Sequence, residues 1–204
     1  MKRIRMAVVI LDVIFGLLLL CALVGGSTTR ERGELTSGNK IEVPEEAEVK
    51  RIALTFDDGP HPSYTECLLD GLKERDVVAT FFVTGEHAAL HPEVIKRMQE
   101  EGHVIGNHTY SHIQLRQDNR ETFKKELQQT NQVLKELTGE DVVYVRPPYG
   151  SWDKELEKEL NMIPVLWSVD PLDWCTGNVQ TVVRRVKEKV KDNSIILMHG
   201  YYET

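Results

Sequence analysis

Residues 51–60 read Arg-Ile-Ala-Leu-Thr-Phe-Asp-Asp-Gly-Pro, a largely apolar run that ends in two carboxylates and a turn. A short apolar run bounded by turn residues is typical of a buried strand. Adjacent carboxylates repel each other when they face the same point, so a fold that keeps both usually separates their tasks. One can ligate a metal ion while the other takes a proton from water. The alternative is that Asp57-Asp58-Gly59-Pro60 is simply a turn, since all four residue types favour turns.

The rest of the chain repeats this alternation of strand and helix. Apolar runs predict strands at 51–56, 79–83, 104–106, 142–145, 163–169 and 194–198, and helices are expected at 65–74, 92–101, 120–138, 153–160 and 179–191. The helix at 120–138 has the clearest pattern, with Asp118 as its expected cap and Gly139 as its end. Strands that alternate with helices indicate an α/β fold with a parallel sheet, open or closed into a barrel.

Polar residues follow five of these strands at the point where each ends. The segments are 57–60, His108 to His112, 146–150, 170–174 and His199. Because parallel α/β sheets place their sites at the carboxyl ends of the strands, we expect these side chains to lie at one rim.

His108 and His112 are four residues apart, so on a helical turn both rings would leave one face and could share an ion. Taken alone, such a pair is often structural. The Asp pair at another strand end favours a metal site, because two histidines and one carboxylate leave coordination positions open for water and substrate. Zinc is the expected ion, and cobalt, nickel or manganese could use the same ligands. The remaining histidines, expected on the surface or in loops, are His61, His87, His91 and His103.

Composition and the N-terminal sequence limit the possible partners and the cellular location of the protein. The chain has 204 residues and a net charge of -7, which offers no broad basic surface for a nucleic acid. A basic start precedes the apolar run from Met6 to Val24, in which Asp12 is the one charge. This pattern predicts an uncleaved membrane anchor over 1–26, a linker over 27–50 and an extracytoplasmic domain over 51–204. The alternative is secretion after signal cleavage.

Five segments together resemble a known family. TFDDGP at 55–60, HTYSH at 108–112, RPPYG at 146–150, DPLDW at 170–174 and IILMH at 195–199 are similar to the five ordered motifs of the polysaccharide deacetylase family, the NodB-homology or carbohydrate esterase 4 group. The resemblance runs from about Arg51 to the end of the chain. It implies a distorted (β/α) barrel of the NodB-homology type. The family normally continues beyond the last motif, so we expect this domain to lack its final helix and strand.

The resemblance also implies roles for single residues. Asp58, His108 and His112 would hold one divalent ion, and Asp57 would be the general base. Arg146 would pair with Asp57 and keep it ionised.

The remaining motif residues would act on the substrate. The backbone N–H of Tyr149 would stabilise the oxyanion together with the ion, and His199 would protonate the departing amine. Asp173 would orient His199 and stabilise its protonated form. Trp174 and Leu197 would line a small pocket for the acetyl methyl group.

These implications predict a metal-dependent enzyme that removes N-acetyl groups from a polysaccharide. Peptidoglycan, through its N-acetylglucosamine residues, is the expected substrate because the anchor would hold the site near the cell wall. Deacetylation of chitin oligomers or acetylxylan uses the same chemistry and stays open. A catalytically silent carbohydrate-binding module and a different metallohydrolase on a similar barrel also stay open.

Overall fold

A computed structural model describes residues 50–200 of the chain. Its centre is a six-stranded sheet with the strand order β5-β4-β3-β2-β1-β6, in which every pair of neighbours is parallel. The strands are β1 (Ile52–Asp57), β2 (Thr80–Val83), β3 (Val104–Asn107), β4 (Tyr144–Val145), β5 (Ile163–Pro164) and β6 (Ser194–His199). The predicted α/β class with a parallel sheet is therefore confirmed.

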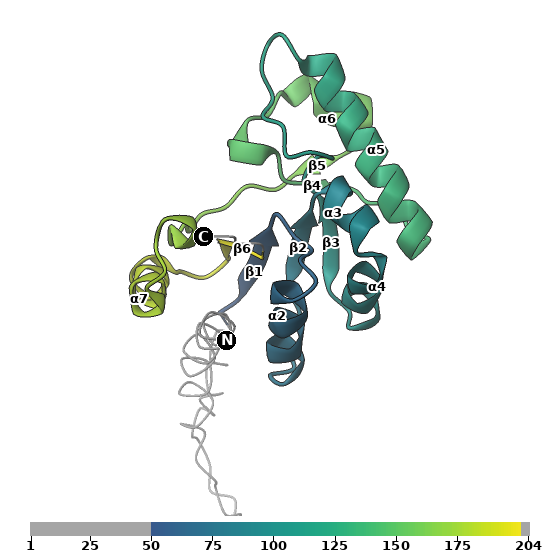
Figure 1. Ribbon diagram of the computed structural model, residues 1–204. Coiled ribbons are helices and arrows are strands. Elements are labelled where there is room, and N and C mark those ends of the chain that lie inside the picture. The colour runs from purple at the N-terminus through teal and green to yellow at the C-terminus, as the bar shows by residue number, and fades with distance from the viewer. Residues whose placement is uncertain (1–49, 201–204) are drawn as a thin grey trace, which may run out of the picture.

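Helices connect the strands and surround the sheet (Figure 1). Figure 1 shows α2 and α4 near the middle strands, α7 on the side of β6, and α5 with α6 beyond β4 and β5. The helices are α2 (Tyr64–Lys73), α3 (Gly85–Leu90), α4 (Pro92–Glu100), α5 (Arg120–Thr138), α6 (Lys154–Leu160) and α7 (Val179–Lys189), with short 3-10 turns at η1 (Pro148–Gly150) and η2 (Asp173–Cys175).

The two faces of the sheet differ in polarity, as the alternation of side chains along β1 illustrates. Leu54 and Phe56 belong to the main apolar core, which the sheet shares with the helices. Thr55 and Asp57 point to the opposite, inner face, where both accept hydrogen bonds from the Arg146 guanidinium. The inner face of the sheet therefore carries the buried polar groups.

The sequence predicts one strand at 163–169, and the structure divides this segment between two edges of the sheet. Ile163–Pro164 pairs with β4, whereas Val169 pairs with β6 through Ile196. The chain between Val165 and Ser168 can span at most roughly 11 Å, so both edges must approach each other. The side chain of Arg146 holds this crossing segment by donating to the carbonyls of Val165 (3.0 Å) and Leu166 (3.4 Å). The sheet is thus curled toward a barrel, as expected.

Helix α5 has the bounds that its sequence pattern predicts. It ends at Gly139, whose φ of 77° is the left-handed conformation that glycine adopts without strain. The expected cap was wrong: the N-cap residue is Asn119 and not Asp118, and its side chain makes no capping hydrogen bond. Helix α3 was not predicted, because six residues are too few to show a helical period.

The proposed anchor at 1–26 and almost all of the linker at 27–50 lie outside the described residues. Within residues 50–200, no helix is both long enough and apolar enough to cross a membrane.

Candidate metal centre and active site

The predicted site residues stand at the carboxyl ends of the strands. Asp57 is the last residue of β1 and His199 the last of β6, and the two occupy paired positions in the sheet. His108 directly follows β3, and Arg146 directly follows β4. The fold therefore brings together side chains that are separated by up to 142 residues in the sequence, from Asp57 to His199.

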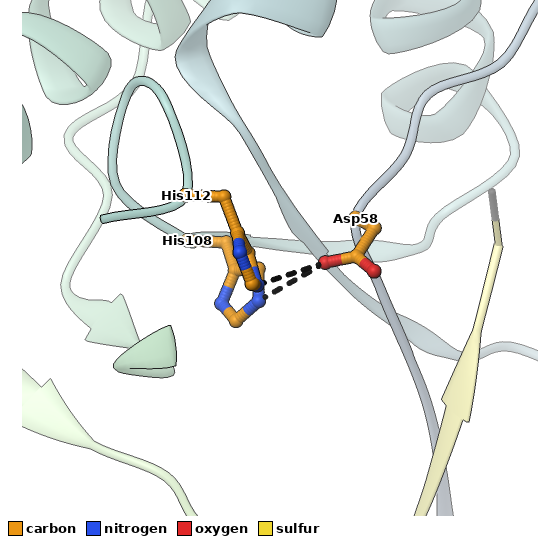
Figure 2. A group of neighbouring side chains, drawn as sticks. All are labelled: Asp58, His108 and His112. Carbon is orange, nitrogen blue, oxygen red and sulfur yellow. Dashed lines mark ion pairs between the residues drawn. The ribbon is translucent and has the colours of Figure 1, made fainter. Parts of the chain in front are cut away.

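Three side chains converge as a metal site would require. Figure 2 shows His108 and His112 reaching from one loop toward Asp58 on another. The same oxygen, Oδ1 of Asp58, lies 3.3 Å from Nε2 of His108 and 3.3 Å from Nε2 of His112. All three ligand atoms lie within 4.8 Å of one another. Tetrahedral ligands about 2.1 Å from a zinc ion are roughly 3.4 Å apart, so this spacing fits the ion.

The proton positions also fit a metal. Nδ1 of His108 lies 2.6 Å from the carbonyl oxygen of Arg146, and because a carbonyl can only accept, Nδ1 must donate. In the neutral ring this leaves the lone pair of Nε2 facing Asp58, as in metal-ligating histidines. Oδ1 of Asp58 is buried and has no hydrogen-bond partner among residues 50–200. A cation would satisfy both the lone pair and this carboxylate oxygen.

The electrostatics of the three groups favour a shared positive charge. Burial alone would lower the pKa of His108, but the charges of Asp57 and Asp58 outweigh it and raise that pKa. Burial and the neighbouring His108 lower the pKa of His112, so the two rings do not readily carry a proton each. Burial alone would raise the pKa of Asp58, but the nearby His108 ring and the charge it can carry outweigh burial and lower that pKa. A carboxylate between two neutral imidazoles is the protonation state that binds a divalent ion.

The histidine loop differs from the expected helical turn. Residues 108–112 form an irregular loop after β3, and the rings converge because Thr109 (φ 64°) and His112 (φ 59°) adopt left-handed backbone conformations. Side chains other than glycine adopt this region rarely. The spacing of four residues was thus informative, although the geometry assumed for it was wrong.

Asp57 lies between the metal trio and a buried arginine. Its Oδ1 accepts a hydrogen bond of 2.7 Å from Arg146, while its Oδ2 lies 3.8 Å from Nε2 of His108. Arg146 is fully buried, and its guanidinium also stacks 4.2 Å from the ring centre of Phe82. Burial raises the pKa of Asp57, and the charges of His108 and Arg146 act against that rise without reversing it. The carboxylate is therefore a stronger base than an exposed aspartate.

His199 donates two hydrogen bonds to the carboxylate of Asp173. The carboxylate accepts from the ring Nδ1 of His199 at 2.9 Å and from its backbone N–H at 2.8 Å. Burial opposes the imidazolium form, but the hydrogen bond and charge of Asp173 outweigh it and raise the pKa of His199. The Arg185 side chain holds the loop before Asp173 by donating to the carbonyls of Pro171 (2.9 Å) and Leu172 (3.4 Å).

The three residues expected around the substrate lie near these groups. Tyr149 has a left-handed backbone with φ of 60°, and its ring meets the edge of the His112 ring at 5.2 Å between centres. Trp174 is half-exposed in the same 3-10 turn as Asp173. Leu197 is buried in β6, in register with Thr55 on the inner face.

Two residues that support the site were not anticipated. His87, at the start of α3, places Nδ1 2.7 Å from the carbonyl oxygen of Asp58 and so holds the backbone of a predicted ligand. Glu126, in the middle of α5, accepts hydrogen bonds from the loop that joins His108 to His112. His103, expected on the surface or in a loop, lies in the connection between α4 and β3 but is buried, and it accepts a hydrogen bond from the backbone N–H of Ala79. No sequence pattern distinguishes Glu126 or His87 from ordinary helix residues.

Comparison with known proteins agrees with this geometry. A family model described as polysaccharide deacetylase matches residues 45–165. The chain is 40% identical over 168 residues to the peptidoglycan-N-acetylmuramic acid deacetylase PdaC of Bacillus subtilis, covering 80% of this chain and 36% of that relative. It is 42% identical over 152 residues to a peptidoglycan-N-acetylglucosamine deacetylase of Bacillus cereus, covering 73% of this chain and 55% of that relative. The chain thus spans less than two thirds of the length of either relative.

Further similarity extends to another substrate class and to a solved structure. A chitooligosaccharide deacetylase of Azorhizobium caulinodans is 36% identical over 152 residues, covering 72% of each chain. The solved structure of the Bacillus subtilis PdaC deacetylase superposes with a TM-score of 0.72 and 41% identity, covering 75% of this chain and 76% of that one.

Proposed function

The chain belongs to the polysaccharide deacetylase family, and we propose that it hydrolyses N-acetyl groups of a cell-wall polysaccharide in a metal-dependent reaction. The observation that supports this most is the position of Asp58 Oδ1, 3.3 Å from both ring nitrogens and next in the chain to the buried carboxylate of Asp57. A ligand set with an adjacent free base is what the hydrolysis of an amide needs.

The ligand chemistry suits one divalent ion. Asp58, His108 and His112 would hold it, with zinc as the ion expected for two imidazoles and a carboxylate. Such an ion, when bound, acidifies water and polarises a carbonyl oxygen.

The chain's own residues supply the proton transfers. Oδ2 of Asp57 faces the ligand atoms and would take the proton of the attacking water, while Arg146 fixes the other oxygen. His199, protonated and oriented by Asp173, would give a proton to the leaving amine. The backbone N–H of Tyr149 would donate to the oxyanion. Trp174 and Leu197 would bound the space for the acetyl methyl group.

The proposed substrate is peptidoglycan, at its N-acetylglucosamine residues. The names of two relatives place acetylated sugars of peptidoglycan among the substrates of similar proteins, and a third relative is named for chitooligosaccharides. All are polymers or oligomers of N-acetylated sugars, so the reaction is common to them. We further propose that the N-terminal segment anchors the protein in the membrane with the domain outside the cytoplasm.

The first test is acetate release from peptidoglycan fragments and from N-acetylglucosamine oligomers, with added zinc and again after chelation. Chelator-sensitive release that zinc restores is expected. Release from the oligomers alone would favour a chitooligosaccharide substrate. A folded, zinc-loaded protein that released no acetate from any acetylated glycan would contradict the proposed reaction.

Substitution of the two aspartates separates their roles. Asp57→Asn should lower turnover by about 10²–10⁴-fold, the usual contribution of a general base, while zinc stays bound. Asp58→Asn should weaken zinc binding itself, because a neutral amide replaces the only carboxylate among the proposed ligands. Zinc content after dialysis, measured beside turnover, distinguishes the outcomes. Near-normal turnover in Asp57→Asn would show that the base is another group.

A further inference from the structure

A single carboxylate on α5 holds the loop that carries both histidine ligands. Oε2 of Glu126 accepts from the backbone N–H of Tyr110 at 3.0 Å and from that of Ser111 at 2.7 Å. Oε1 accepts from the Ser111 hydroxyl at 2.7 Å. These three donors belong to two of the three residues that lie between His108 and His112.

The opposite side of the same loop is fixed by the start of α3. The backbone N–H of Gly85 donates to the carbonyl of Thr109 at 2.9 Å, and that of Glu86 donates to the carbonyl of Tyr110 at 3.0 Å. Backbone carbonyls on one side of the loop and backbone amides on the other side are therefore both hydrogen-bonded. This matters because Thr109 (φ 64°) and His112 (φ 59°) hold uncommon left-handed conformations, which persist only where the surroundings determine them.

Within residues 50–200, the carboxylate of Glu126 makes its hydrogen bonds to this loop alone. Within residues 50–200 it forms no ion pair, although several neighbouring charged residues of α5 do, among them Arg120 and Lys124. A partly buried carboxylate that accepts hydrogen bonds from a loop without a cationic partner orders that loop.

We propose that Glu126 is a positioning residue that presets the geometry of the His108–His112 loop and thereby sets the affinity for the metal ion. The inference rests on the proposed function, because it concerns the same metal site. Without Glu126, binding an ion would first require the loop to be ordered, so the apparent affinity would fall while the ligands themselves remained.

Two substitutions at Glu126 separate charge from hydrogen bonding. Glu126→Ala removes all three acceptor contacts. Glu126→Gln keeps a carbonyl oxygen where Oε2 accepts both backbone amides, and its NH2 can donate to the Ser111 hydroxyl, which also accepts. The matched control is Glu136→Ala, because Glu136 is exposed on the same helix and contacts the Gln132 side chain.

The measurement is the Zn²⁺ dissociation constant of the full chain, by competition with a chromogenic chelator. Glu126→Ala should bind zinc about 10–100-fold more weakly, the usual effect of removing a residue that orients metal ligands. Glu126→Gln should stay within about threefold of wild type, and Glu136→Ala should be unchanged. The visible spectrum of the Co²⁺ form should change in Glu126→Ala and be restored in Glu126→Gln, which a general loss of stability would not produce.

The outcomes separate this inference from the function on which it rests. Wild-type zinc affinity in a folded Glu126→Ala protein would overturn the positioning role and leave the deacetylase proposal intact. Failure of the wild-type chain to bind zinc would instead overturn the metal site itself. If Glu126→Ala does not fold, Ser111→Ala decides, since it removes one donor without altering α5. Weaker zinc binding in that variant supports the role, and unchanged binding overturns it.

Discussion

At the scale of single residues, the pair of His199 and Asp173 makes a proton-transfer role measurable. The Asp173 carboxylate bonds both the ring and the backbone of His199, and its charge outweighs burial so that the pKa of His199 lies above its ordinary value of 6.5. A general acid works only in its protonated form, so activity should fall as pH rises through this raised pKa. The alkaline limb of kcat/KM is therefore expected above pH 6.5.

Asp173→Asn tests this assignment. Without the negative charge, burial remains and favours the neutral ring, so the pKa of His199 should fall. The alkaline limb should then move to lower pH by about one unit or more. The measurement is kcat/KM against pH for both proteins at saturating zinc. A limb that stays in place would assign the alkaline transition to another group.

The sequence predicts the candidate ligands and catalytic residues better than the residues that hold them in place. Asp58, His108 and His112 were predicted to be ligands because their residue types and their positions after strands suggest ligation, and the structure places them together. Glu126 and His87 could not be identified, because a glutamate or a histidine inside a helix is common. Their importance lies in the direction of a carboxylate or a ring nitrogen toward a backbone, which only tertiary packing determines.

At the scale of elements, periodicity predicted the long segments and missed the short ones. Helix α5 is long enough to repeat its pattern over several turns, and its bounds were found from the sequence. The segment at 163–169 is as apolar as a strand. However, Arg146 donates hydrogen bonds to the carbonyls of Val165 and Leu166, so this segment crosses the inner face and pairs with both edges of the sheet. That interaction joins side chain and backbone groups 19 and 20 positions apart, which no local pattern records.

The contact between α3 and α5 gives a prediction at this scale. A Cβ at Gly85 would lie 2.5 Å from the Thr130 hydroxyl and 2.5 Å from the Tyr110 ring, so the two helices can approach this closely only with glycine. Gly85→Ala should lower the free energy of unfolding by about 1–3 kcal/mol through overpacking. It should also weaken zinc binding, because the Gly85 amide holds the loop at Thr109.

Gly177→Ala is the matched control, since a Cβ at Gly177 would meet no atom within 4 Å. Chemical denaturation with chelator present gives the stability, and zinc titration gives the binding. An equal free energy of unfolding for Gly85→Ala and wild type would show that α3 and α5 can move apart without loss of stability.

At the scale of the whole molecule, the barrel-like sheet is organised around the buried side chain of Arg146. Arg146 joins β1, through Thr55 and Asp57, to the crossing segment at Val165. The main apolar core lies on the outer face under the helices, whereas the inner face carries buried polar groups beside Phe82 and Leu197. The Arg146 guanidinium thus both holds the crossing segment and orients Asp57, the proposed base. The fold and the site therefore depend on the same side chain.

This organisation predicts that the domain works without the N-terminal region. All six strands, both apolar core clusters and every proposed site residue lie within residues 50–200. A protein that lacks residues 1–49 should therefore bind zinc and deacetylate soluble oligosaccharides within about twofold of the full chain, since no proposed ligand or catalytic group is removed.

The full chain should sediment with membranes and the shortened one should not, because the apolar run at 6–24 is the proposed anchor. Fractionation and acetate release from the same preparations measure both properties. Full-length protein in the soluble fraction would reject the anchor while leaving the catalytic domain as proposed, whereas loss of zinc binding on shortening would mean that the first 49 residues contribute to the site.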